Sequence, residues 1–214
     1  MAETLTPNAA NQAVPGWRAL ASGLHITVAT GDFATALALV DRIGAIAEEQ
    51  QHHPDLDLRW GRVHVVTSSH DVGGISERDV RLATAVNEVL AEMGLEAETT
   101  RVAQLEIAID AMDIPAVRPF WIAVLGYDVG RGQTLVDPES IRPALWFQQM
   151  DEPRPQRNRV HFDVWVAPEE AEGRIARAID AGGRLVSDTE APSFWVLADP
   201  EGNEVCICTP ADRG

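Results

Sequence analysis

The chain has 214 residues, of which 45% are hydrophobic and 23% charged, a composition that suits one or two folded domains with buried cores. Its formal net charge of -16 disfavours contact with nucleic-acid phosphates, and all 17 basic residues are arginine, which excludes Schiff-base chemistry and a P-loop lysine. The two cysteines, Cys206 and Cys208, are too few for a disulfide framework. The sequence shows no signal peptide and no membrane-spanning apolar run, so we expect a cytoplasmic protein that binds neither nucleic acid nor membranes.

The first half of the chain alternates between strand and helix patterns. Residues 1–14 are polar and predict a disordered or weakly ordered N-terminus. Two short strands follow, and then a helix with Asp32 as its N-cap. This helix should end at His53, because Pro54 disfavours helical geometry in the residue before it. A strand pair that turns at Gly61 comes next.

A second helix in this half begins at Ser76-x-x-Asp79, which has the spacing of a capping box with Asp in place of Glu. Gly94 suits the left-handed position that ends such a helix. Together these elements predict an α+β domain over residues 15–95, in which a four-stranded antiparallel sheet carries helices on one face.

The second half of the chain repeats one pattern. Residues 101–151 and 158–210 both read as βαβββ, and we expect this paired domain to span residues 101–211. Its strands have an aliphatic face and a mixed face of polar residues and tryptophans, and the mixed faces predict a small-molecule cleft. The mixed faces carry Gln104, Glu106, Ala108, Ala144, Trp146, Gln148, His161, Asp163, Trp165, Glu204, Cys206 and Cys208.

Four of the six histidines are close together in the first half: His52, His53, His64 and His70. Adjacent residues on an extended backbone point in roughly opposite directions, so His52 and His53 are poorly placed to share a metal ion. Histidine can take and give protons near neutral pH, which favours an acid–base site, and Glu48 and Asp79 are available to orient the imidazoles. His64 lies among valines on a strand, and we interpret it as a structural residue.

The segment "EEQQHHPDLDLRWGRVHVVTSSHDVGGISERDVRLA" resembles the pterin-4a-carbinolamine dehydratases, also called 4a-hydroxytetrahydrobiopterin dehydratases. Their pattern has a Glu four residues before His-His-Pro, an aromatic residue six after the Pro, a hydrophobic strand ending in Thr-His, and then Gly-Leu-Ser/Thr-x-x-Asp. The matching residues are Glu48, His52, His53, Pro54, Trp60, His70, Gly74, Ile75, Ser76 and Asp79, with Gly16–Trp17 upstream. Leu56, Trp60 and Ser69 stand where relatives usually carry Trp, Tyr and Thr, changes that concern the pocket walls more than the proton-carrying groups.

The resemblance implies a dehydratase, a lyase that needs no cofactor. Its substrate would be 4a-hydroxytetrahydropterin, and its products would be quinonoid dihydropterin and water. It implies proton transfer by His52 and His70, orientation of the substrate by His53, and supporting roles for Glu48 and Asp79. The implied substrate-binding residues are Trp60, Ser69 and Pro54. It also implies a homodimer or homotetramer.

The stretches "FWIAVLGYDV", "LWFQQMDEPRPQRNRVHFDVWV" and "WVLADPEGNEVCI" resemble the glyoxalase-like, vicinal-oxygen-chelate superfamily. In its metal-using members four ligands come from equivalent strands, and the corresponding candidates here are Gln104, Gln148, His161 and Glu204. Gln148 stands in place of a glutamate, which removes a negative charge and makes a weak site for Zn²⁺ or Fe²⁺. A divalent metal, a metal-free pocket and a structural domain all stay open.

We therefore expect a two-domain enzyme that combines a pterin dehydratase with a small-molecule-binding domain of unknown ligand. Two alternatives come from other functional classes. One is a non-catalytic binding or scaffold protein that uses the first domain for association. The other is a metal-dependent activity of the glyoxalase or dioxygenase type in the C-terminal domain.

Overall fold

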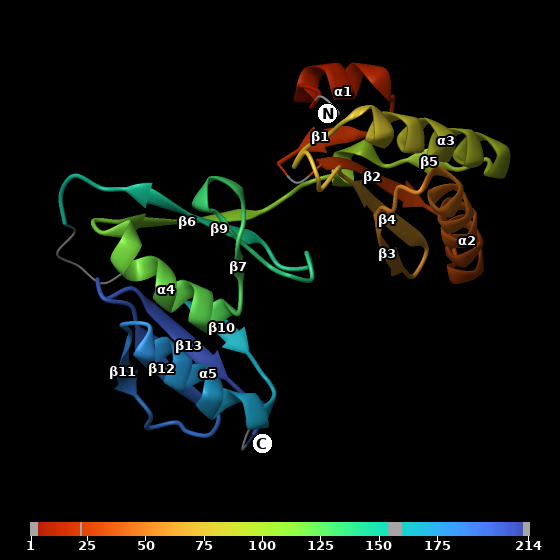
Figure 1. Ribbon diagram of the computed structural model, residues 1–214. Coiled ribbons are helices and arrows are strands. Elements are labelled where there is room, and N and C mark those ends of the chain that lie inside the picture. The colour runs from red at the N-terminus through yellow and green to blue at the C-terminus, as the bar shows by residue number, and fades with distance from the viewer. Residues whose placement is uncertain (1–3, 22, 154–159, 212–214) are drawn as a thin grey trace. The chain divides into compact units, whose positions relative to one another are not determined.

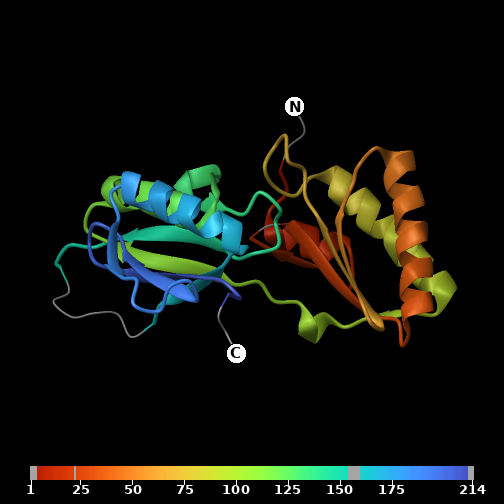
Figure 2. The same cartoon turned by 90° about the horizontal axis from the view of Figure 1, so that it is seen from below.

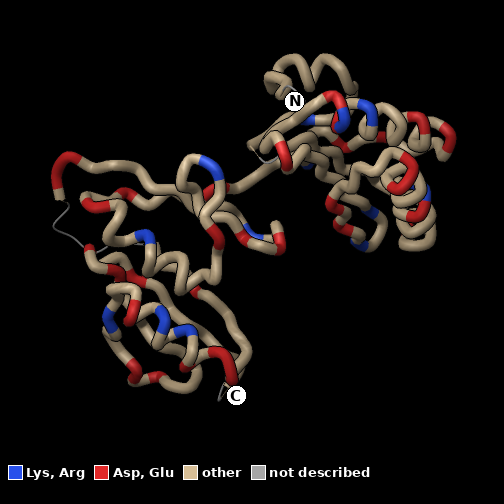
Figure 3. Tube along the Cα trace, in the orientation of Figure 1, with Lys and Arg blue, Asp and Glu red and all other residues tan. Residues whose placement is uncertain are grey.

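The computed structural model describes residues 4–21, 23–153 and 160–211. The chain forms two compact units, Met1–Gln104 and Leu105–Gly214 (Figure 1). Acidic residues are spread over both units (Figure 3). No helix in the described ranges is long and apolar enough to cross a membrane.

The first unit is built on an antiparallel sheet with the strand order β1-β2-β4-β3. Its strands are β1 (Arg18–Leu20), β2 (Gly23–Ala29), β3 (Asp55–Arg59) and β4 (Arg62–Thr67). A fifth, two-residue strand, β5 (Glu96–Ala97), pairs with β2, and the N–H of Glu98 donates to the carbonyl of Thr27 at 2.7 Å. Residues between the two predicted domains therefore extend this sheet, and the turn η1 (Thr99–Arg101) follows them.

Helices cover one face of this sheet. They are α1 (Pro7–Ala13), α2 (Phe33–Gln50) and α3 (Glu77–Met93), and Figures 1 and 2 show α2 and α3 side by side against the strands. Leu24, Ile26 and Val28 alternate along β2 and are fully buried, and they belong to one hydrophobic core with residues of all three helices. The predicted fold class and the predicted face for the helices are confirmed.

Helix α1 lies where the sequence pattern indicated weak order. Thr6 caps it by accepting a hydrogen bond from the N–H of Ala9, and Pro7 occupies the first turn, where its missing N–H costs nothing. Ala10 and Val14 are buried in the core. The expectation of a disordered N-terminus is wrong for this helix, because its apolar residues are docked in the core; residues 1–3 lie outside the described part of the chain.

The second unit contains the predicted repeat twice. The first copy consists of β6 (Glu106–Ala111), α4 (Ile114–Leu125), β7 (Asp128–Val129), β8 (Leu135–Val136) and β9 (Ala144–Gln149), with the turn η2 (Arg131–Gln133) before β8. The second copy consists of β10 (Phe162–Trp165), α5 (Pro168–Asp180), β11 (Arg184–Ser187), β12 (Phe194–Ala198) and β13 (Glu204–Cys208). Their sheets have the orders β6-β9-β8-β7 and β10-β13-β12-β11, so the first strand of each copy pairs with the fourth, in parallel.

The aliphatic faces of both sheets form one core with α4 and α5. Phe120 and Trp121 of α4 are buried in it, and their rings meet edge to face. Gly183 follows α5, and a Cβ there would lie 2.2 Å from the ring of Phe120, which explains the need for glycine. The mixed faces are more open, since Trp146 is 37% and Trp165 55% exposed.

Candidate active site

The end of helix α2 fixes the backbone of His52. Gln51 adopts a left-handed conformation with φ 49°, and the N–H of His52 donates to the carbonyl of Ala47 at 3.1 Å. The side-chain amide of Gln51 donates to the carbonyl of Glu48 at 2.8 Å. These bonds close the helix at Gln50, so the predicted end at His53 is three residues too late.

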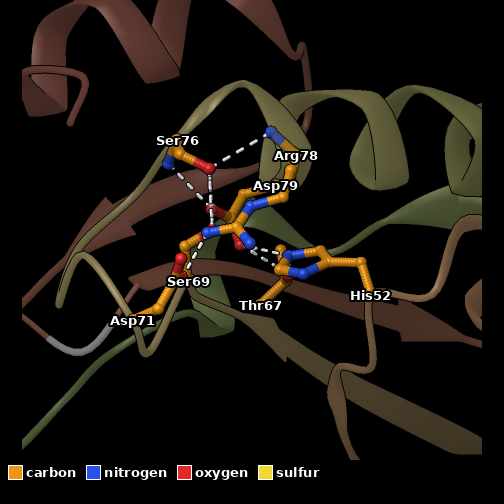
Figure 4. Close-up of polar contacts among 7 residues, drawn as sticks. All are labelled: His52, Thr67, Ser69, Asp71, Ser76, Arg78 and Asp79. Carbon is orange, nitrogen blue, oxygen red and sulfur yellow. Dashed lines mark hydrogen bonds and ion pairs between the residues drawn. The ribbon is translucent and has the colours of Figure 1, made fainter. Parts of the chain in front are cut away.

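The side chain of His52 joins a buried polar network around Asp79 (Figure 4). Asp79 is fully buried, and its Oδ1 lies 2.8 Å from both His52 Nε2 and the Thr67 hydroxyl, which donates to it. Its Oδ2 accepts hydrogen bonds from the Ser69 hydroxyl and from the N–H of Ser76, each at 2.7 Å. Every oxygen of this carboxylate is thus satisfied, as a buried charge requires.

Three segments converge on this carboxylate. Thr67 ends β4, Ser69 follows it two residues later on the same side of the backbone, and Ser76 and Asp79 form the predicted capping box of α3, which is confirmed. An isolated bridge between Ser69 and Gly74 closes the intervening turn. The side chain of Asp79 therefore caps a helix with one oxygen and holds His52 with the other.

The charge of Asp79 determines which ring nitrogen of a neutral His52 carries the proton. Burial raises the pKa of Asp79, but hydrogen bonds from Ser76, Ser69, His52 and Thr67 together outweigh it and place the pKa below its usual value. The ionised carboxylate can only accept hydrogen bonds, so we assign the proton of neutral His52 to Nε2. His52 Nδ1 then carries the lone pair that can take a proton.

His53 and Glu48 form a second, exposed pair beside this network. His53 Nε2 lies 3.1 Å from Glu48 Oε1, and the two side chains are 58% and 74% exposed. An exposed pair of this kind adds little stability. Its exposure instead leaves His53 accessible to a dissolved substrate, while the adjacent His52 is buried.

His70 lies in the turn after β4 and is exposed. Its carbonyl accepts a hydrogen bond from the N–H of Gly73 at 3.2 Å, and within the described residues its side chain has no hydrogen bond or ion pair. The preceding residue, Ser69, is anchored on Asp79, and the ion pair between Arg78 and Asp71 ties the turn to α3. The turn therefore keeps the backbone of His70 next to the network without fixing its imidazole.

The predicted substrate-binding residues do not gather in one place. Ser69 belongs to the network, and Pro54 is half-buried between His53 and β3. Trp60 is 77% exposed at the tip of the β3–β4 hairpin, at the end of β4 opposite Thr67 and about 20 Å along the strand from it. The chain therefore does not bring Trp60 together with His52, and the substrate-binding role of Trp60 stays a prediction.

Residues 3–89 match the family model of pterin 4 alpha carbinolamine dehydratase, and residues 106–208 match that of a glyoxalase-like domain. Two similar proteins bear the name "putative pterin-4-alpha-carbinolamine dehydratase". The one from Thermomicrobium roseum is 41% identical over 78 residues, 36% of this chain and 84% of the relative. The one from Thermosynechococcus vestitus is 39% identical over 92 residues, 42% of this chain and 97% of the relative.

This chain belongs to the pterin 4 alpha carbinolamine dehydratase family.

The dehydratase-family match falls inside the first unit and includes helix α1, and the glyoxalase-like match falls inside the second unit. A solved structure titled transcriptional coactivator/pterin dehydratase, from Brucella melitensis, is 27% identical and has a TM-score of 0.39; the match covers 41% of this chain and 98% of that one.

His64 and Thr67 show what sequence reasoning found and missed in the dehydratase unit. His64 lies on the sheet face away from the helices, where its Nδ1 is 2.8 Å from the Thr27 hydroxyl and its Nε2 is 3.3 Å from Nδ1 of the buried His25. Burial, with a smaller effect of His64, lowers the pKa of His25 to about 4. The structural interpretation of His64 fits these contacts. Thr67 was missed, although alternation along β4 places it on the same side as Ser69.

The four predicted metal ligands are divided between the two predicted repeats of the glyoxalase-like domain, and their role as ligands stays a prediction. Gln104 precedes β6, so it is not on the strand where the prediction placed it. Gln148 pairs with Asp110 near the C-terminal ends of β6 and β9. The group of potential ligands found in the described residues is His161, Asp163 and Cys206, whose donor atoms all lie within 4.8 Å of one another. Of the predicted ligands this group contains His161, and Asp163 and Cys206 were not among those predicted.

A cavity of about 380 Å³ opens in the first repeat of the glyoxalase-like unit. Its size lies in the range of small-molecule sites. Glu106 and Trp146 come from the predicted mixed faces, whereas Arg118 and Phe147 contribute a guanidinium 5.9 Å from the centre of an aromatic ring. The mixed faces of β6 and β9 thus line a cavity together with α4.

Proposed function

We propose that the first unit catalyses the dehydration of a 4a-hydroxytetrahydropterin. The observation that carries this proposal is the pairing of buried His52 with ionised Asp79 directly beside the exposed His53. Membership of the dehydratase family supports the substrate class. The reaction removes a proton from N5 and a hydroxyl from C4a, forms the C4a–N5 double bond, and releases water.

In this proposal His52 is the base. Its Nδ1 carries the lone pair because Nε2 donates to Asp79, so Nδ1 can accept the N5 proton. The resulting imidazolium is stabilised by the adjacent carboxylate, which stays ionised, in the manner of the histidine–aspartate pair in serine hydrolases. The Thr67 hydroxyl, 3.1 Å from His52 Nε2, limits rotation of the ring.

His70 is the proposed acid, and His53 the proposed orienting group. A hydroxyl leaves C4a more readily as water than as hydroxide, so a group that supplies a proton speeds the step. The exposed imidazole of His70, on a turn anchored by Ser69, can reach a bound substrate. His53, held by Glu48 at 3.1 Å, would position the hydroxyl for this transfer.

The direct test is turnover of chemically generated 4a-hydroxytetrahydropterin by the wild type and by His70→Ala. Loss of a general acid should lower the catalysed rate roughly 10²–10⁴-fold. His161→Ala, in the other unit, is the matched control and should keep the wild-type rate. Equal catalysed rates for His70→Ala and the wild type would overturn the proposed mechanism. No rate above the spontaneous reaction for either would overturn the proposed function and favour the scaffold alternative.

We also expect the chain to form a homodimer or homotetramer, as the family resemblance implies. Light scattering after size-exclusion chromatography measures the mass directly. A mass of two or four chains of 23.3 kDa supports the expectation, and a monomer contradicts it.

A further inference from the structure

Three donor side chains that the dehydratase mechanism does not use meet on the second sheet of the glyoxalase-like unit. His161 directly precedes β10 and Asp163 is the second residue of that strand, so the alternation of an extended backbone turns their side chains to one face. Cys206 is the direct neighbour of Asp163 in the parallel pairing of β10 with β13. The sheet register therefore brings an imidazole, a carboxylate and a thiol together.

The distances among these donors suit a small cation. A tetrahedral zinc ion with ordinary bond lengths to nitrogen, oxygen and sulfur holds its donor atoms about 3.3–3.7 Å apart. His161 Nε2 lies 3.6 Å from Asp163 Oδ1, and all three donor atoms are within 4.8 Å of one another. A small rotation of the side chains would bring the remaining distances into that range.

The burial of the group suits a site with one fixed and two adjustable ligands. Cys206 is 9% exposed, and its strand neighbours Val205 and Ile207 are fully buried, so β13 holds the sulfur in place. The side chains of His161 and Asp163 are each 51% exposed and have room to adjust. A cation would thus be held by the rigid Cys206 and could enter from solvent on the side of His161 and Asp163.

We infer that His161, Asp163 and Cys206 form a binding site for a divalent cation of the zinc type. A thiolate and an imidazole favour Zn²⁺ or Co²⁺ over Mg²⁺ or Ca²⁺, which prefer an all-oxygen set. Three protein ligands leave a fourth position for water or a small ligand. All three come from the second repeat, unlike the four-ligand set drawn from both repeats that the superfamily resemblance implied.

Cobalt offers a probe that reports the thiolate directly. Co²⁺ would be added to the full chain, freed of metal and kept under a non-thiol reductant, and the absorption spectrum recorded. A thiolate bound to Co²⁺ gives a sulfur-to-metal charge-transfer band in the near ultraviolet, and the chain has two cysteines as its possible sources. We expect the band to saturate at one equivalent and to disappear when Zn²⁺ is added.

Four variants assign the ligands. Cys206→Ser should lose the charge-transfer band, whereas Cys208→Ser, the matched control two residues along β13, should keep it. His161→Gln and Asp163→Asn are changes at half-exposed positions that should leave the fold intact, and each should weaken Co²⁺ binding by at least about 10-fold. Circular dichroism confirms that each variant is folded.

The inference is overturned if the wild type shows no such band, if the band persists in Cys206→Ser, or if His161→Gln and Asp163→Asn bind Co²⁺ as tightly as the wild type. None of these outcomes depends on dehydration of a pterin. The histidines of the first unit could bind Co²⁺ as well, but without sulfur they cannot produce the charge-transfer band.

Discussion

At the scale of single residues, the candidate site depends on Asp79. This carboxylate accepts hydrogen bonds from Ser69, Thr67 and the N–H of Ser76, and it holds His52. One side chain therefore links the start of α3, the end of β4 and the end of α2. Its negative charge is also the group that would stabilise a protonated His52.

The Asp79→Asn variant should separate the effect of the negative charge of this side chain from the effect of its size. The amide has nearly the same size, but it is neutral and turns one acceptor into a donor, so at least one hydrogen bond to it fails. We expect a loss of about 1–3 kcal/mol in the free energy of unfolding, measured by denaturant titration. The dehydration rate should fall about 10- to 100-fold, less than on removal of a proton-transfer histidine. A variant with the wild-type rate would show that the charge of Asp79 has no part in catalysis.

The ionisation of Asp137 predicts how the folding stability of the second unit changes at acid pH. Its hydrogen bonds, chiefly with Arg142, lower its pKa from 3.8 to about 2. Because the folded-state pKa is the lower one, this contribution is complete above pH 3.8 and is lost as the pH falls toward 2. In urea titrations the wild type should exceed Asp137→Asn in stability at neutral pH, and the difference should shrink steadily as the pH falls from 3.8 to about 2. A difference that does not change with pH would contradict the lowered pKa.

At the scale of elements, most of the secondary structure could be predicted because its signals are local. Asp32 and Ser76 cap helices, Gly94 ends one in a left-handed conformation, and both βαβββ repeats are present. The errors occurred where a tertiary contact or an unrecognised local backbone conformation decides the outcome. Helix α1 has a weak pattern and is stabilised by docking of Ala10 and Val14 in the core. The early end of α2 depends on the left-handed Gln51 rather than on Pro54.

The candidate site, like the secondary structure, could be predicted only in part from the sequence. Spacing predicted that Asp79 supports the histidines, but it carried no information on Thr67, which reaches His52 only through the strand pairing of the folded sheet. Trp60 matched the family pattern in spacing and nevertheless lies at the far end of β4. In the second unit the sequence did not show that Asp163 and Cys206 are neighbours, because that pairing is set by the register between β10 and β13.

The start of β2 offers a test of the link between sheet packing and the site. Gly23 has φ 153°, and a Cβ there would lie 2.4 Å from the carbonyl oxygen of Thr67. Gly23→Ala should therefore push β2 and β4 apart at Thr67, lower the stability and slow dehydration together. Gly44→Ala, inside α2 with open space around its Cβ, is the control and should raise stability by about 0.5–1 kcal/mol. A stable, fully active Gly23→Ala variant would show that this backbone contact is not needed.

At the scale of the whole molecule, each unit has its own hydrophobic core and its own candidate site. The dehydratase network lies entirely within residues 47–79, inside the first unit. The relatives from T. roseum and T. vestitus are matched over 84% and 97% of their length by this unit. We therefore expect that the proposed dehydration does not require the glyoxalase-like unit.

Residues 1–104 expressed alone should consequently fold and retain dehydration within about 10-fold of the full chain. Folding can be followed by circular dichroism, and the rate with 4a-hydroxytetrahydropterin. If the fragment folds but has no activity, the second unit contributes to the site. Added Zn²⁺ should leave the rate of the full chain unchanged, since the inferred metal ligands belong to the other unit.

The most direct test of the central claim, that His52 held by Asp79 is the base of a pterin dehydratase, compares His52→Ala with His64→Ala. Both remove one imidazole from the first unit, but His64 lies on the opposite face of the sheet. The measurement is the rate of 4a-hydroxytetrahydropterin dehydration above the spontaneous reaction. We predict a fall of roughly 10²–10⁴-fold for His52→Ala and a rate close to wild type for His64→Ala. A folded His52→Ala variant with the wild-type rate would contradict the claim.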